Sequence, residues 1–273
     1  MKISTCITNP NIFGKPLDEI MEQLAAIGFD GIDVPADNEH YPIAEIQPIV
    51  ESYRNDLPVP EITACMNPSR DLTNPNTAKR NVALAYIKLC IDTAAALGVP
   101  CTHLCFITTP EILASEPRTK LEKRAVAALQ ECGGYARDSG VRLIVEPLFK
   151  GDNTIVNTCE QAVALFTQAL DVDPNDFKAG RTEWGLLGDL FHMHHEEEDY
   201  LGALHEYAAA IRHVHVADHP RGLDFTRPDS TFVQEGIDQL RASGYGGYVS
   251  FESFDDSVNY EVLREAVQVI KQF

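Results

Sequence analysis

Short β-rich runs alternate with amphipathic helical stretches along the whole chain. The β-rich runs predict strands at 2–7, 29–34, 61–66, 101–107, 141–146, 184–189, 211–218 and 247–252. Each is followed by a stretch with helical periodicity, at 17–28, 43–56, 76–97, 117–138, 158–170, 199–210, 231–242 and 257–272. This alternation is typical of parallel α/β folds. Eight such modules predict a single (β/α)₈ barrel.

The length of 273 residues is close to the usual size of such a barrel, so we expect residues 1–273 to form one domain. A hydrophobic content of 44% is sufficient for a large core. No linker or low-complexity segment interrupts the modules, and no glycine-rich nucleotide-binding motif is present.

Charge and cysteine content narrow the function classes. A net charge of −19 disfavours nucleic acid, whose phosphates need a basic surface, and also an anionic membrane. The N-terminal segment has no apolar run long enough for a signal peptide or membrane helix. The seven cysteines are scattered and form no C-x-x-C motif, as in a reduced cytoplasmic protein.

Candidate chemistry lies in the predicted strands five to eight. Glu146, Asp189 and Glu252 close the runs VRLIVE, WGLLGD and GYVSFE, and His215 lies in IRHVHVAD. In a (β/α)₈ barrel the C-terminal strand ends meet at the functional rim. Three carboxylates and one imidazole suit one divalent ion, with Mn²⁺ favoured and Mg²⁺ or Co²⁺ as alternatives.

Each of these side chains also has a structural interpretation. Glu146 or Glu252 can form an ion pair at the rim, and Asp189 can cap the helix after it. His213 shares a strand face with His215 and is expected to be a hydrogen-bonded support. The metal site is favoured because the four groups fall one per strand.

Two further candidates follow these strand ends. His192, His194 and His195 form a cluster three to six residues after Asp189, and of these we expect only His192 to function. Arg221 comes six residues after His215, in the loop after strand seven.

The segments VEPL, GDLFHM, HVHVAD and FESF resemble the sugar phosphate isomerase/epimerase superfamily of TIM barrels, most closely its ketose 3-epimerases (the tagatose and psicose 3-epimerase group). The resemblance covers most of the chain. It implies that His192 and Arg221 hold substrate O1 and O2. It also implies four metal ligands, which are Glu146, Asp189, His215 and Glu252.

The chain departs from the family pattern near the substrate. The segment EPLFKGD carries Lys150 and Asp152 where the family has an Asn-Arg pair and a Glu, and Asp152 is expected to support or contact the same end of the sugar. Residues 222–230 replace a Pro-Gly-x-Gly stretch, and Asp33 stands where Glu is common. These changes leave the metal set intact and bear on which sugar is bound.

The resemblance implies C3 epimerisation of a ketose through an enediolate, with Glu146 and Glu252 as the acid and base. An unphosphorylated sugar is favoured, because no phosphate-binding loop follows strands seven or eight. The alternatives are an inosose dehydratase or hydroxypyruvate isomerase type, an endonuclease IV-like enzyme and a non-catalytic sugar-binding barrel. A homo-oligomer is left open.

Overall fold

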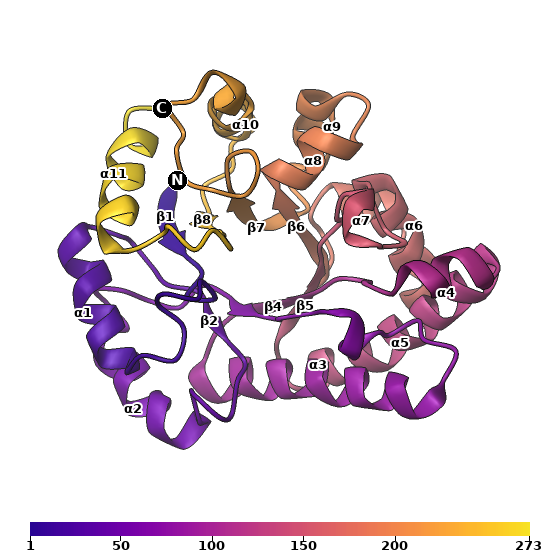
Figure 1. Ribbon diagram of the computed structural model, residues 1–273. Helices are drawn as coiled ribbons and strands as arrows, with labels where there is room; N and C mark the ends of the chain where they lie inside the picture. The colour runs from indigo at the N-terminus through magenta and orange to yellow at the C-terminus, as the bar shows by residue number, and fades with distance from the viewer.

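Eight parallel strands form the centre of the structure, a computed structural model that describes all residues from 1 to 273. They are hydrogen-bonded in the order β1-β8-β7-β6-β5-β4-β3-β2, and a parallel bridge between Cys6 and Asp33 joins the chain after β1 to the start of β2. The predicted (β/α)₈ barrel is thereby confirmed, with helices around the strands (Figure 1). The strands are β1 (Lys2–Thr5), β2 (Val34–Pro35), β3 (Ile62–Thr63), β4 (Cys101–Leu104), β5 (Arg142–Val145), β6 (Gly185–Asp189), β7 (Ile211–Val216) and β8 (Tyr248–Phe251).

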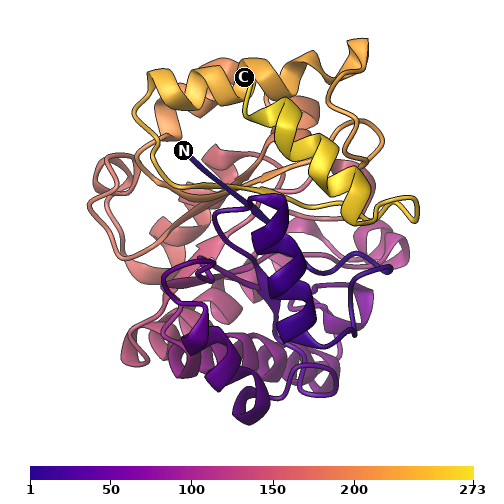
Figure 2. The same ribbon diagram turned by 90° about the vertical axis from the view of Figure 1, so that its left-hand side faces the viewer.

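The outer layer is helical. Its helices are α1 (Leu17–Ile27), α2 (Ile43–Ser52), α3 (Thr77–Leu97), α4 (Pro110–Ser115), α5 (Arg118–Asp138), α6 (Cys159–Leu170), α7 (Pro174–Lys178), α8 (Leu190–Glu196), α9 (Tyr200–Tyr207), α10 (Thr231–Ala242) and α11 (Tyr260–Ile270). Single 3₁₀ turns lie at η1 (Pro68–Arg70), η2 (Lys150–Asp152) and η3 (Pro228–Ser230). Helices α1 and α11, from opposite ends of the chain, lie beside one another (Figure 2).

Local signals set the limits of the long helices. Asn76 caps α3, because its side chain accepts hydrogen bonds from Ala78 N at 2.8 Å and Lys79 N at 3.4 Å. The same helix ends at Gly98, whose φ of 68° lies in the left-handed region that glycine adopts without strain. These limits agree with the predicted helix at 76–97.

Some elements differ from the prediction in extent. Strands β2 and β3 have two residues each, where 29–34 and 61–66 were expected. Pro35 has no amide hydrogen to continue the β2 ladder, and Met66 N bonds locally to Ala64 O after β3. The predicted helix at 199–210 ends at Tyr207, and α4, α7 and α8 were not predicted.

The main core lies between the strands and the helices and joins 72 buried residues from Ile3 to Ile270. A small separate layer consists of Cys101, Ile144 and Leu187. Ile144 and Leu187 each lie two residues before an acidic strand end, so they share its face of the strand. The acidic groups are therefore supported from below by apolar side chains.

Candidate active site

The four predicted ligands lie at the carboxyl ends of adjacent strands. Glu146 follows β5, Asp189 ends β6, His215 lies near the end of β7 and Glu252 follows β8. All four are buried, and the strand register pairs Asp189 with His215. Each offers a ligand atom within 4.8 Å of those of the other three. The fold thus brings together residues that are more than 100 positions apart in the chain.

Arg221 lies against two of these carboxylates. Its Nη1 donates to Asp189 Oδ2 at 2.7 Å, and its Nη2 donates to Glu252 Oε2. Burial alone would raise the pKa of Glu252, but His215 and Arg221 hold that pKa well below its usual value. Burial alone would also raise the pKa of Asp189, but the charge of Arg221 outweighs this effect and the pKa is lowered. One guanidinium, however, balances only part of the charge of three carboxylates.

Two buried atoms at the centre of the group have no hydrogen-bond partner, Glu146 Oε1 and His215 Nδ1. They lie 3.7 Å apart, and His215 Nδ1 is 3.5 Å from Glu252 Oε2. Unpartnered buried polar atoms are unfavourable, and a cation held among them would remove that penalty. Three carboxylates and an imidazole are suitable ligands for Mn²⁺ or Mg²⁺. The residues present therefore fit a divalent metal ion.

His215 is supported from behind by a chain of buried polar groups. Its Nε2 lies 3.5 Å from Cys6 Sγ, which is 3.7 Å from Asp33 Oδ2. Burial raises the pKa of the Cys6 thiol to about 12, so this thiol stays neutral and is a poor metal ligand. Asp33 Oδ2 also lies 2.8 Å from His213 Nε2, which makes His213 the predicted hydrogen-bonded support. Such contacts orient the ring so that Nδ1 faces the centre.

The sequence pattern does not point to a second buried pair, Glu61 and His103. His103 Nδ1 lies 2.8 Å from Glu61 Oε1, and its Nε2 lies 3.7 Å from Glu146 Oε2. Burial alone would lower the pKa of His103, but the charges of Glu61 and Glu146 raise it. Glu146 thus has an imidazole near each of its carboxylate oxygens. In the sequence, the only sign of this pair is a His within the predicted strand 101–107 and a Glu at the start of the strand predicted before it, 61–66.

A cavity of about 490 Å³ opens above the acidic group, a size suited to a small molecule. The three residues predicted to contact substrate, His192, Asp152 and Arg221, all line it. His192 Nε2 is 3.6 Å from Asp189 Oδ2, and its Nδ1 is 3.8 Å from Asp152 Oδ2. Burial raises the pKa of Asp152, and His192 partly offsets this. Apolar lining comes from Met66, Ile107, Leu148, Phe149, Phe191 and Phe254.

Other positions noted in the sequence lie elsewhere. Lys150 Nζ pairs with Glu196 at 2.8 Å, and the Lys150 side chain is 77% exposed and does not line the cavity. Residues from the 222–230 loop line a separate surface hollow. His195 lines the cavity together with His192, whereas His194 stacks on Phe232. That only His192 of the three functions stays a prediction.

The fold and this geometry agree with a comparison to known families. A family model described as xylose isomerase-like TIM barrel matches residues 21–273. The chain belongs to this family. The predicted superfamily resemblance is thereby confirmed. As a separate finding, none of the helices is long and apolar enough to cross a membrane.

Relatives within the family are sugar epimerases. D-psicose 3-epimerase of Agrobacterium fabrum is 26% identical over 86% of this chain and 78% of its own length. 3-Dehydro-D-guloside 4-epimerase of Escherichia coli is 25% identical over 92% of both chains. The structure of D-psicose 3-epimerase with D-tagatose from Clostridium cellulolyticum H10 has a TM-score of 0.80 at 19% identity and covers 100% of this chain and 98% of that one. The chain is therefore an enzyme of the isomerase/epimerase type.

Proposed function

We propose that this protein is a metal-dependent epimerase that inverts C3 of a free ketose. The main support is the buried group of Glu146, Asp189, His215 and Glu252 at the base of a sugar-sized cavity. These four residues would hold one divalent ion, for which Mn²⁺ is favoured and Mg²⁺ or Co²⁺ are alternatives. When bound, such an ion supplies Lewis-acid polarisation of the substrate carbonyl.

Glu146 and Glu252 would transfer the protons. The C3–H bond of a ketose is acidic because it lies next to the C2 carbonyl. One carboxylate removes this proton, and the C–H electron pair forms the C2=C3 bond of an enediolate while O2 takes the negative charge. The other glutamate, protonated, delivers a proton to the opposite face of C3, and the roles exchange in the reverse direction. Placement of the two groups after β5 and β8 supports this assignment.

His192, Arg221 and Asp152 would orient the sugar. Phe149 N donates to His192 Nδ1 at 3.3 Å, which leaves the Nε2 hydrogen to donate to a sugar oxygen. Arg221 donates to the same end of the substrate, and Asp152 accepts from a hydroxyl. The apolar ring of Phe149, stacked on His192, limits the space beside them.

An unphosphorylated sugar is supported by the charges around the cavity. Arg221 is the only Lys or Arg that lines it, and its guanidinium is bonded to Asp189 and Glu252. Lys150, the other cation near this end, is paired with Glu196. A phosphate dianion would therefore meet three carboxylates in the lining, Glu146, Asp152 and Glu252, and no Lys or Arg that lacks a carboxylate partner.

A 3-keto-glycoside is the second candidate substrate class, because the relative from Escherichia coli matches along 92% of both chains. In that case the proton removed would come from C4, next to a C3 carbonyl. The glutamate pair would perform the same chemistry at a different carbon.

The test is a substrate panel with Mn²⁺ in D₂O, containing free ketoses, ketose phosphates, 3-keto-glycosides and inososes. We expect a free ketose to be epimerised with deuterium incorporated at C3, and Glu252→Gln to abolish both. Deuterium at C4 of a 3-keto-glycoside would favour the second class, and loss of water would indicate a dehydratase. A product without solvent deuterium, or a preference for a ketose phosphate of about 100-fold in kcat/KM, would contradict the proposal.

A further inference from the structure

The opposite end of the barrel contains a second cavity, of about 320 Å³. Its lining includes Arg142 at the start of β5, Arg212 in β7 and Tyr248 at the start of β8. Glu146 lies four residues further along the β5 strand direction, which corresponds to about 13 Å. This lower cavity is therefore separate from the candidate active site.

Two arginines in the lower cavity lack a counter-ion. The Nε atoms of Arg142 and Arg212 are both buried without a hydrogen-bond partner. Arg212 Nη2 donates only to backbone carbonyls, those of Gly180 at 2.8 Å and Thr182 at 3.2 Å. Burial lowers the pKa of Arg212, and the nearby charge of Arg142 lowers it further. Placing two neighbouring cations where water reaches them only in part is unfavourable unless an anion balances their charge.

The backbone is shaped to admit Arg212. The β6–β7 register shifts between Leu186 and Leu187, an irregularity of the kind that re-aims a side chain. Gly185 lies beside it, and a Cβ there would be 2.4 Å from Arg212 Cγ and 3.1 Å from its Nε. Only glycine leaves room for this arginine in its present position.

The charge around the cavity is opposite to that of the chain as a whole. The chain has 41 acidic and 22 basic residues, yet no Asp or Glu lines this cavity. The other charged or titratable nitrogen groups of the lining have partners outside it, since Arg54 pairs with Glu51 and His213 with Asp33. Arg142 and Arg212 are thus the cations of the cavity that have no carboxylate partner and whose buried Nε atoms have no acceptor.

We propose that the lower cavity binds a small oxyanion, either inorganic phosphate or the phosphate group of a small ester. A guanidinium presents paired N–H donors that match phosphate oxygens, and two guanidinia balance a dianion. Tyr248 adds a phenol at the same wall. The site is independent of the proposed epimerase function.

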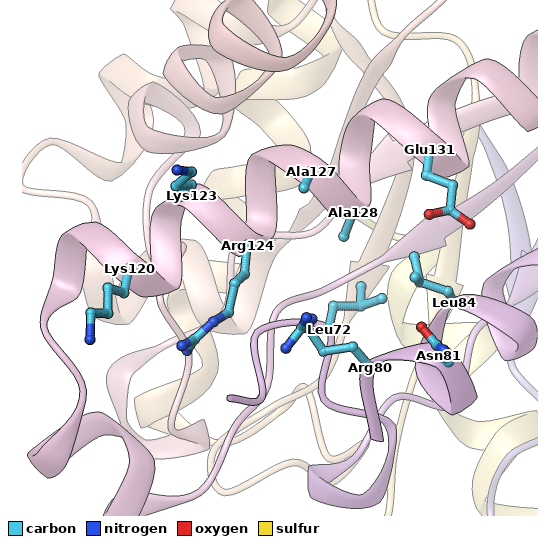
Figure 3. A pocket seen from close by; sticks show the side chains of 10 residues that line it. All are labelled: Leu72, Arg80, Asn81, Leu84, Lys120, Lys123, Arg124, Ala127, Ala128 and Glu131. Atoms are coloured by element: carbon cyan, nitrogen blue, oxygen red, sulfur yellow. The ribbon is translucent and has the colours of Figure 1, made fainter. Parts of the chain in front are cut away.

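A second cationic hollow, between α3 and α5, provides the control (Figure 3). Arg80 and Arg124 line it, but Arg80 already donates to Asn74 O at 2.7 Å, and Arg124 pairs with Glu116 at 2.7 Å. Lys120 and Lys123 are exposed. Its cations are bonded or solvated, so it lacks the unpartnered buried donors of the lower cavity.

The experiment measures binding of inorganic phosphate and of a hexose 6-phosphate to the metal-loaded enzyme by calorimetry, at an ionic strength fixed with NaCl. We expect saturable binding that Arg142→Gln weakens at least about tenfold and that Lys120→Gln/Lys123→Gln leaves unchanged. Tighter binding of the ester would identify it as the ligand class. In chloride alone, Arg142→Gln should unfold at the same or a higher temperature than the parent, because a like-charge contact is removed.

Equal binding by the parent and Arg142→Gln would overturn the proposal, as would no saturation with either ligand. Loss of binding in the lysine variant would overturn it too, because it would assign the anion to the α3–α5 hollow. If Arg142→Gln does not fold, Arg142→Lys takes its place. That variant keeps the charge but loses the paired donors, and it should weaken binding several-fold.

Discussion

Asp189 uses its two carboxylate oxygens for different purposes. Oδ1 accepts from Phe191 N at 2.8 Å and His192 N at 3.3 Å and so caps α8, whereas Oδ2 accepts from Arg221. The two interpretations of this residue from the sequence, helix cap and metal ligand, are therefore compatible. The position of His192 depends on the same cap.

Replacing Asp189 separates the two roles. Asp189→Asn keeps a capping oxygen but loses the charge, whereas Asp189→Ala loses both. Both variants should lose metal in elemental analysis, and the Ala variant should be less stable than the Asn variant by about 1 kcal/mol in urea unfolding. Full metal occupancy in both would exclude Asp189 as a ligand.

The buried pair of Glu61 and His103 should be important for stability. Glu61 is 0% exposed, and His103→Ala removes the imidazole that pairs with it. We expect a loss of about 3 kcal/mol in unfolding free energy, because a buried carboxylate is left uncompensated. Adding Glu61→Gln removes the charge and should recover part of this loss. A double variant no more stable than the single one would show that the charge is not the cause.

At the scale of elements, α5 contains a natural comparison in its adjacent glycines. A Cβ at Gly134 would meet nothing within 4 Å, whereas one at Gly133 would lie 3.1 Å from Leu170 Cδ1 and 3.5 Å from Trp184. Gly134→Ala should therefore stabilise the protein by about 0.5–1 kcal/mol through helix propensity. Gly133→Ala should gain less, because Leu170 must move. Thermal unfolding of the two variants decides this, and an equal gain would mean that the α5–α6 contact adapts freely.

Elements were predictable where the sequence pattern is local. The strand ends at Glu146, Asp189 and Glu252 follow from apolar runs that stop at a charged residue, and Asn76 and Gly98 mark the ends of α3. The short β2 was not predictable in extent, because it depends on pairing with β3 and on where Pro35 interrupts the ladder.

Contacts between residues of distant strands could not be predicted from the pattern of hydrophobic and polar positions. His103 and Glu61 are 42 residues apart, and His213 and Asp33 are 180 apart, so no spacing rule links them. The position of Arg212 in the lower cavity likewise depends on a register shift between β6 and β7. In each case the barrel closure, and not the local sequence, decides which polar groups meet.

For the whole molecule, four neighbouring strands, β5 to β8, converge on the proposed metal site. Three carboxylates repel one another there, and a bound cation would remove that repulsion in the folded state alone. At a metal concentration of 100 times the dissociation constant, binding adds about 2.7 kcal/mol of stability, which raises the unfolding midpoint by roughly 5 °C or more in a domain of this size.

Chelation should therefore lower the unfolding temperature of the parent, and Mn²⁺ should restore it. His215→Asn removes one ligand from the centre of the group, so its unfolding temperature should respond little to chelator or Mn²⁺. This comparison needs no substrate, and it tests the metal site separately from the proposed reaction. The contrary outcome is an unfolding temperature of the parent that neither chelator nor Mn²⁺ changes, measured at Mn²⁺ concentrations that support epimerisation. It would show that the metal acts without being held by these four strands.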